Sequence, residues 1–307
     1  MPLIAREERL RAGGVVAPLF VPALDERKLH KAWALAEAVI IDLEDAVADH
    51  RKSEAREWVR TLAGRKELTW VRVNAADTGR CRDDILAVAA NAAVIVLPKC
   101  QSADDVILAL SALDASGSGA LLLPIIETAA GLEAAPAVAR AAPGRMARLS
   151  LGLGDLSRDL GIPWEPGGPM AQHARCHVGI ISRAAGLPAP IDTVVPTVGN
   201  VRMLEEDTAR ARAAGFGGKF CIHPTQVPVV QAGFRPSEAE SLLARRQVLA
   251  FVDAIRRGGA AVVVDGYFVD YPVAELAEAL LARAGQATGL LPDRDKLPGS
   301  GTPASSK

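Results

Sequence analysis

Aromatic residues and an excess of charge of either sign are both scarce in this sequence. Phe, Trp and Tyr make up 4% of its 307 residues, and the formal net charge is −1. A balance this close to zero provides no general attraction for nucleic acid or for an anionic membrane surface, so we expect neither kind of partner. Any basic binding site has to be local.

Paired cysteines and long apolar runs are also missing. The four cysteines, Cys81, Cys100, Cys176 and Cys221, lie far apart and form no C-x-x-C pair, which fits reduced thiols better than a disulfide framework. The first segment, MPLIAREERLRAGG, carries charges where a signal peptide needs an apolar stretch. Runs such as AAVIVLP are far too short to cross a bilayer. We therefore expect a cytoplasmic protein.

Apolar residues are plentiful, at 50% of the chain, and they recur in a regular rhythm. Short runs rich in Val, Ile and Leu alternate with amphipathic helical segments, which indicates a parallel sheet covered on both faces. Eight such units over about 220 residues predict a (β/α)8 TIM barrel, an α/β fold. The expected strands lie within residues 15–22, 38–44, 69–74, 92–99, 121–127, 148–154, 191–196 and 218–224.

The chain continues beyond the eighth unit with segments that a barrel does not need. A long helical stretch follows, and then a strand–turn–helix pattern, AAVVVDGYFVDYPVAELAEALLARAG. We expect the barrel domain over residues 1–230 and a helical extension, acting as a lid or an oligomer arm, over 231–285. The polar remainder, 286–307, has the composition of a disordered tail.

Two carboxylates stand where apolar runs end: Glu127 follows PII and Asp155 follows LGLG. The carboxyl ends of barrel strands meet at one mouth, so these two side chains are expected to share a hard cation. Two carboxylates with water suit Mg²⁺ or Mn²⁺ rather than zinc. The alternative is that each carboxylate caps the helix that follows it.

Further charged residues close other runs. Arg72 is placed to fork a carboxylate or to stabilise an enolate oxygen. It can equally form an ion pair with the acidic cluster Asp42, Glu44 and Asp45, and both interpretations can hold together. The cluster could itself bind a second metal ion, but we favour a supporting role in which it positions Arg72.

Other motifs have weaker interpretations. His173, Cys176 and His177 have a spacing that can ligate zinc, but no glutamate follows His173 as H-E-x-x-H requires, and an ordinary helix face is favoured. LGLGD lacks the continuation of a dinucleotide-binding loop, and no G-x-S-x-G element supports a serine hydrolase. Arg27 and Lys31 form part of a basic run that is either a solvated helix face or a phosphate-binding surface at the barrel mouth.

Taken together, these segments resemble a known family. Eight segments occur in its order from about residue 18 to 240: LFVPALDERKLHKA, VIIDLEDAV, VRVNAADTG, VLPK, PIIETAAG, LGLGDLSRDLG, AAGLPAPID and GFGGKFCIHPTQ. The chain resembles the citrate lyase β-subunit-like branch of the HpcH/HpaI aldolase superfamily. That resemblance implies a TIM barrel and Mg²⁺-dependent cleavage or formation of a carbon–carbon bond beside a CoA thioester. It also implies that Glu127 and Asp155 bind the metal while Arg72 and Glu127 contact substrate.

The resemblance carries further expectations. Phe20, Arg27 and Lys31 fall where relatives hold the CoA moiety, although this chain has Ala23 where relatives have glycine after Val-Pro. Asp270 in GYFVD matches a lid aspartate that acts as a general acid or base, or assists thioester hydrolysis. In relatives that lid completes a neighbouring subunit's site, which implies a homotrimer or a hexamer.

The implied reaction converts a 3-hydroxyacyl-CoA, such as malyl-CoA or citramalyl-CoA, into a 2-oxo acid and acetyl-CoA, or runs in reverse. Two alternatives stay open. One is a CoA-independent class II pyruvate aldolase, which has no use for Arg27 and Lys31. The other is a carrier-dependent, citrate lyase β-like subunit of a larger complex, which would be inert alone.

Overall fold

The computed structural model describes residues 14–62, 66–286 and 288–292. The polar lead-in and most of the tail expected to be disordered lie outside these ranges. Contacts between residues divide the chain into two units, Met1–Phe234 and Arg235–Lys307. The first unit holds the strands and helices expected of the barrel, and the second holds the extension.

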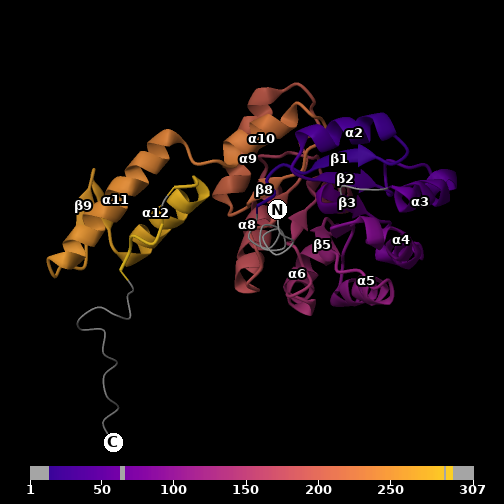
Figure 1. The fold of residues 1–307 in the computed structure, drawn as a ribbon, viewed down its shortest axis with the longest axis horizontal. Coiled ribbons are helices and arrows are strands. Elements are labelled where there is room, and N and C mark those ends of the chain that lie inside the picture. Colours follow the sequence, from indigo (N-terminus) through magenta and orange to yellow (C-terminus); the bar gives the residue numbers. More distant parts are fainter. Residues whose placement is uncertain (1–13, 63–65, 287, 293–307) are drawn as a thin grey trace, which may run out of the picture. The chain divides into compact units, whose positions relative to one another are not determined.

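Eight parallel strands form one sheet in sequence order (Figure 1). Hydrogen bonds close it on itself: the Phe20 amide donates to the Cys221 carbonyl at 2.8 Å, and the Lys219 amide donates to the Val16 carbonyl at 2.8 Å. The predicted (β/α)8 barrel is confirmed. The strands are β1 Leu19–Pro22, β2 Val39–Asp42, β3 Thr69–Arg72, β4 Val94–Leu97, β5 Leu121–Ile126, β6 Ser150–Leu151, β7 Ile191–Asp192 and β8 Gly218–Lys219.

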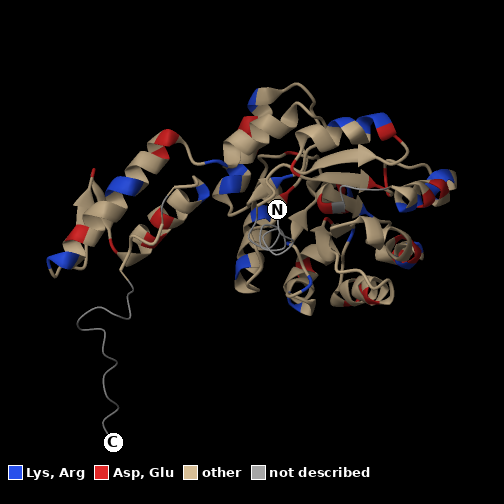
Figure 2. Ribbon diagram, in the orientation of Figure 1, with Lys and Arg blue, Asp and Glu red and all other residues tan. Residues whose placement is uncertain are grey.

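Helices connect successive strands and cover the outer face of the barrel (Figure 1). Acidic and basic segments both occur on the helices seen in Figure 2. The helices are α2 Glu26–Leu35, α3 Lys52–Thr61, α4 Cys81–Val88, α5 Ala103–Ala115, α6 Ala129–Ala141, α7 Leu153–Leu160, α8 Pro169–Ala184, α9 Val201–Ala213 and α10 Gln226–Phe234. Short 3₁₀ turns lie at η1 Asp49–Arg51, η2 Lys66–Leu68, η3 Ala76–Thr78 and η4 Ala89–Asn91.

Alternation along the strands divides the core into two layers. Residues such as Ile41, Val71 and Ile95 belong to the cluster formed with the outer helices. Their neighbours, including Ile40 and Trp70, fill the barrel interior. Because side chains alternate between faces, both sides of each strand are buried, which explains why the sequence shows continuous apolar runs.

The sixth strand is shorter than the sequence predicted. It ends at Leu151, and α7 begins at Leu153, so Asp155 lies in the first turn of a helix rather than at a strand end. The Leu153 amide donates to the Thr193 hydroxyl at 3.0 Å, which fixes the point where the chain turns from strand to helix. Asp155 therefore reaches the barrel mouth from a helix.

A fully buried ion network joins β7 and β8 to α8 and α9. Arg175 and Lys219 each contact both Asp192 and Asp207, at 2.6–3.1 Å, and all four side chains are completely inaccessible to solvent. Two cations face two anions, so each buried charge is compensated by its partners. We do not assign Arg175 and Lys219 to the active site, because neither residue lines the cavity at the carboxyl ends of the strands.

The second unit contains α11 Glu238–Arg256, the antiparallel strands β9 Val262–Val264 and β10 Tyr267–Val269, and α12 Tyr271–Arg283. The sequence predicted one strand, a turn and a helix here, whereas the structure has a hairpin before the helix. Asp265 and Gly266, with φ of 49° and 83°, form the two-residue turn that an Asp-Gly pair favours. Among the described helices, none has the length and apolarity needed to span a membrane.

Candidate active site

A cavity of about 530 Å³ lies at the carboxyl ends of the barrel strands. Six residues predicted for the site line it: Phe20, Asp42, Asp45, Arg72, Glu127 and Asp155. The remaining lining residues are Val21, Pro22, Ala46, Ile125, Leu151, Gly152, Gly154, Arg158, Trp164, Thr193, Val194, Phe220 and Ile222. The fold thus brings most of the predicted residues to one place.

Arg72, the last residue of β3, is held rigidly beside the cavity. Its Nε and one terminal nitrogen donate to the two oxygens of Asp42, at 2.8 and 2.7 Å, and its other terminal nitrogen lies 2.9 Å from Glu44. Burial works against the charge of Arg72, but these carboxylates raise its pKa, so the guanidinium stays charged. The two interpretations of Arg72 are compatible, because a guanidinium has more N–H donors than these contacts use.

The acidic cluster divides into two buried members and an exposed one. Asp42 also accepts from the backbone amides of Glu44 and Ala46, at 2.9 and 3.1 Å. Burial opposes its ionisation, but Arg72 keeps the pKa of Asp42 below its usual value. Burial raises the pKa of Glu44 despite Arg72 and Lys99. Asp45 is 58% exposed and lies farther from Arg72, at 3.6 Å. Asp42, with two hydrogen bonds, and Glu44, at 2.9 Å, therefore orient the guanidinium.

Lys99 has a supporting role that the sequence did not reveal. Its side-chain nitrogen pairs with Glu44, and its backbone amide donates to Oε1 of Glu127 at 2.7 Å. Lys99 has φ of 48°, a conformation rare for residues other than glycine. Such strain is found where a site requires it. A backbone hydrogen bond leaves no side-chain signal, so the sequence could place Lys99 only at a strand end.

Glu127 directly follows β5 and is 3% exposed. Its second oxygen, Oε2, lies against Gly152: a Cβ added there would be 2.3 Å away. Burial, followed by the charge of Asp155, raises the pKa of Glu127 to about 8, although Arg72 opposes this. Two carboxylates are therefore held close enough to repel each other.

Asp155 completes that pair from the first turn of α7, and its oxygen lies 2.6 Å from Arg158 in the next turn. Neither Glu127 nor Asp155 caps a helix. Thr128 caps α6 by accepting from Gly131, and Gly152 occupies the N-cap of α7. Within the described ranges, no group of three or more His, Cys, Asp or Glu side chains could hold a metal ion. The carboxylates that could bind a metal ion together at the mouth are thus a pair, Glu127 and Asp155.

The residues expected to hold CoA separate into two kinds. Phe20 lines the cavity, packs edge-on against Phe220 with ring centroids 5.2 Å apart, and lies 5.0 Å below the guanidinium of Arg72. Arg27 and Lys31 are exposed on α2 and do not line the cavity. The turn before α2 places Leu24 at φ 67°, so Leu24 rather than Ala23 adopts the left-handed conformation.

Asp270 belongs to the second unit, where it caps α12 by accepting from the Val273 amide at 3.2 Å. That contact gives it a structural function within its own unit. Its expected chemical role stays a prediction.

Trp164, Gly152 and Gly154 shape the cavity wall, although the sequence did not assign a role to any one of them. The indole of Trp164 packs so closely on Gly154 that an added Cβ would be 3.2 Å from the ring. Its buried Nε1 donates to no described acceptor. The glycines of LGLG, weak as a nucleotide motif, are needed here because Gly152 leaves space for Glu127 and Gly154 for Trp164.

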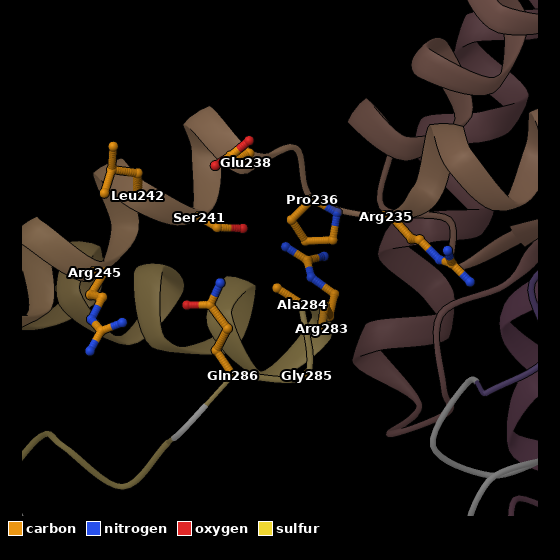
Figure 3. Close-up of a pocket in the computed structure, with 10 residues that line it drawn as sticks. All are labelled: Arg235, Pro236, Glu238, Ser241, Leu242, Arg245, Arg283, Ala284, Gly285 and Gln286. Atoms are coloured by element: carbon orange, nitrogen blue, oxygen red, sulfur yellow. The ribbon is translucent and has the colours of Figure 1, made fainter.

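A second hollow, of about 670 Å³, lies within the C-terminal unit between residues of α11 and those at the end of α12 (Figure 3). Its arginines, Arg235, Arg245 and Arg283, are all exposed, and Arg235 extends away from the other labelled side chains. Glu238 is the one carboxylate among its lining residues. It lacks the buried, oriented charges that distinguish the barrel mouth.

Barrel enzymes have their active sites at the carboxyl ends of the strands, and this is where the paired carboxylates and the clamped arginine of this barrel lie. A family model described as HpcH/HpaI aldolase/citrate lyase matches residues 17–224. The chain therefore belongs to the HpcH/HpaI aldolase/citrate lyase family, and it is a carbon–carbon lyase by class.

Individual relatives agree with this assignment. The chain is 37% identical over 285 residues to a citrate lyase subunit beta-like protein of Mycobacterium tuberculosis, covering 91% of this chain and 98% of the relative. It is 37% identical over 277 residues to a (3S)-malyl-CoA thioesterase of Cereibacter sphaeroides, covering 87% and 93%. The crystal structure of CitE from M. tuberculosis in complex with magnesium, acetoacetate and coenzyme A aligns with a TM-score of 0.77 and 33% identity, covering 89% of this chain and 100% of that chain.

Proposed function

We propose that this enzyme cleaves, or in reverse forms, a carbon–carbon bond in a 3-hydroxyacyl-CoA such as malyl-CoA or citramalyl-CoA. The products are a 2-oxo acid and acetyl-CoA, and the reaction depends on Mg²⁺, for which Mn²⁺ can substitute. One observation carries the proposal: Glu127, Asp155 and Arg72 line a single cavity at the barrel mouth. The magnesium, acetoacetate and coenzyme A bound to the CitE relative support it.

The residues present fit a divalent ion. Glu127 and Asp155 offer the carboxylate oxygens that Mg²⁺ and Mn²⁺ prefer. The charge of Asp155 helps to raise the pKa of Glu127, and a cation beside both would relieve that repulsion. The Lys99 amide holds one oxygen of Glu127, and Gly152 leaves room for the other. A bound divalent ion supplies Lewis-acid polarisation of substrate oxygens.

Arg72 has the position and charge of an oxyanion-stabilising group. In the cleavage direction the substrate hydroxyl loses its proton and the carbon–carbon bond breaks. Its electron pair leaves as the enolate of acetyl-CoA, which then takes up a proton. Arg72 donates to the developing oxyanion while Asp42 holds the guanidinium in place at 2.7 and 2.8 Å. Because the clamp exists before substrate binds, little reorganisation is needed during the reaction.

The CoA portion is assigned to Phe20, Arg27 and Lys31. Phe20 lies in the cavity, and the exposed cations of α2 suit phosphates that stay in solvent. Asp270 is proposed as the general acid or base of a lid contributed within a homotrimer or hexamer. The enzyme is proposed to act in the cytoplasm.

Thioester hydrolysis is the second candidate, favoured by the 37% identity to a (3S)-malyl-CoA thioesterase. The two reactions give different products: cleavage yields a 2-oxo acid without a free thiol, whereas hydrolysis of the acyl-CoA releases CoA thiol. A CoA-independent aldolase or a carrier-dependent subunit would give neither product from free acyl-CoA esters.

The test is a panel of 3-hydroxyacyl-CoA esters incubated with Mg²⁺, in which 2-oxo acid and free thiol are measured separately. Oxo acid without thiol supports the lyase, and thiol alone supports the hydrolase. Arg72→Lys and Glu127→Gln serve as active-site controls, and full turnover in either variant would refute its role. Reversal of charge at Arg27 and Lys31 should raise KM for the CoA ester, and an unchanged KM would refute their assignment to CoA binding.

A further inference from the structure

Arg158 contacts one of the two proposed metal ligands. It lies three residues after Asp155 on α7, and its terminal nitrogen is 2.6 Å from a carboxylate oxygen of Asp155. Both residues line the mouth cavity. The Asp155 side chain is 20% exposed and that of Arg158 is 68% exposed, so the pair lies where solvent meets the site.

We propose that Arg158 has two alternating partners: Asp155 in the metal-free enzyme, and the carboxylate of the 2-oxo acid once a divalent ion has taken Asp155. This inference rests on the proposed function, because it requires the ion at Asp155 and an acid in the cavity. It assigns to Arg158 a substrate-binding role additional to those of Arg72 and Glu127.

The exchange is energetically easy. An ion pair this exposed is weak, and it lowers the affinity for a competing cation by roughly five-fold at most. A divalent ion has twice the charge of a guanidinium and also interacts with Glu127, so it displaces Arg158 from Asp155. Because Arg158 lines the cavity, its displaced guanidinium stays within reach of a ligand there.

Arg158 is the cavity cation best placed to change partners. Arg72 is bound to Asp42 and Glu44, and Lys99 is bound to Glu44, so neither is released when a metal ion binds. Within the described part of the chain, Arg158 forms an ion pair with Asp155 alone. A guanidinium released beside a cavity pairs readily with a carboxylate in two-pronged geometry.

The experiment separates the two partners. Arg158→Gln removes the charge and retains much of the length of the side chain. Binding of Mn²⁺ alone is followed by electron paramagnetic resonance, and binding of pyruvate to the Mn²⁺-loaded protein by calorimetry. We expect the variant to bind Mn²⁺ about three- to five-fold more tightly and pyruvate about ten-fold more weakly than wild type.

A matched control is available at the start of α3, where Arg51, the last residue of η1, and Glu54 form another pair three residues apart, at 2.7 Å. Arg51→Gln should change neither affinity. Unchanged Mn²⁺ affinity, or unchanged pyruvate affinity, in Arg158→Gln overturns the inference. Asp155→Asn tests the proposed function separately: if it binds Mn²⁺ like wild type, the metal assignment itself is wrong.

Discussion

Two charged clusters of the barrel differ in their charge balance, and this difference distinguishes a structural cluster from one suited to catalysis. The cluster of Arg175, Lys219, Asp192 and Asp207 is fully buried and balanced, with two cations against two anions. The mouth cluster holds five carboxylates against three cations; its members are Asp42, Glu44, Asp45, Glu127, Asp155, Arg72, Lys99 and Arg158. The mouth therefore has two formal negative charges in excess, which match one divalent ion.

This contrast teaches that a buried charge alone does not indicate function. Every charge of the balanced cluster is satisfied by its neighbours, so it ties strands to helices and offers nothing to a ligand. At the mouth, Glu127 is almost as deeply buried but has its pKa raised to about 8, by burial and by Asp155. The perturbed group in a cavity is the one suited to bind a ligand.

The largest effect is expected from Glu127→Gln at the mouth. The amide retains the shape and can still accept from Lys99, but it removes a metal-binding charge. We expect kcat to fall by about 10³-fold or more, measured as oxo acid released from a 3-hydroxyacyl-CoA. The circular dichroism spectrum should be unchanged, and turnover within ten-fold of wild type would contradict the assigned role.

Lys219→Met in the balanced cluster should act on stability instead. It leaves Asp192 and Asp207 with Arg175 as their one fully buried cation, because Arg210, 3.9 Å from Asp207, is 34% exposed. We expect the free energy of unfolding to fall by about 3–5 kcal/mol in urea titrations. Arg202→Met is the control, because the pair of Arg202 with Glu206 is exposed and its loss should cost less than about 0.5 kcal/mol. Equal effects of the two variants would remove the distinction between the clusters.

Gly152→Ala tests whether the position of the Glu127 carboxylate matters, without removing its charge. The added methyl group would lie 2.3 Å from Oε2, so the carboxylate has to move. We expect Mn²⁺ affinity to weaken by about 30-fold, since a small displacement of a ligand is costly. Gly119→Ala is the control because an added Cβ there meets nothing within 4 Å. Tight Mn²⁺ binding by Gly152→Ala would show that Oε2 is not needed.

The smallest effect is a pH dependence of the Mg²⁺ affinity, which arises from Glu127 at the mouth. The pKa of Glu127 is raised from 4.5 to about 8, so below pH 8 the metal ion has to displace a proton. Mg²⁺ affinity should fall by about ten-fold per pH unit between pH 7.5 and 6.5, measured by calorimetry.

The same raised pKa fixes the sign of a stability effect in the metal-free enzyme. The protonated carboxyl is favoured in the folded state, so Glu127 makes folding less favourable as pH rises from 4.5 towards 8. Metal-free Glu127→Gln should therefore unfold at a higher temperature than wild type at pH 8.5. A lower unfolding temperature would contradict the raised pKa.

The sequence predicted the barrel and most residues at its mouth for a clear reason. Strands buried on both faces need continuous runs of apolar residues, and a strand end that faces the mouth has to be polar. Arg72 and Glu127 can therefore be recognised in the sequence as the polar residues that end such runs. Asp155 was expected at a strand end and lies on a helix instead, because Thr193, distant in sequence, holds the start of α7. Lys99, Gly152 and Trp164 went unassigned because their contributions are made by a backbone amide, by empty space and by packing.

What the sequence determined by itself is periodic or local: the alternation of strand and helix, the polar strand ends, and the segments that resemble the family. Only the tertiary structure decided which charges compensate each other. Asp192 and Glu127 are both carboxylates close to strand ends, yet one is neutralised by Lys219 and Arg175 while the other faces Asp155. The physical reason is that electrostatic energy depends on distance in space and on burial, and neither is encoded in any single stretch of the chain.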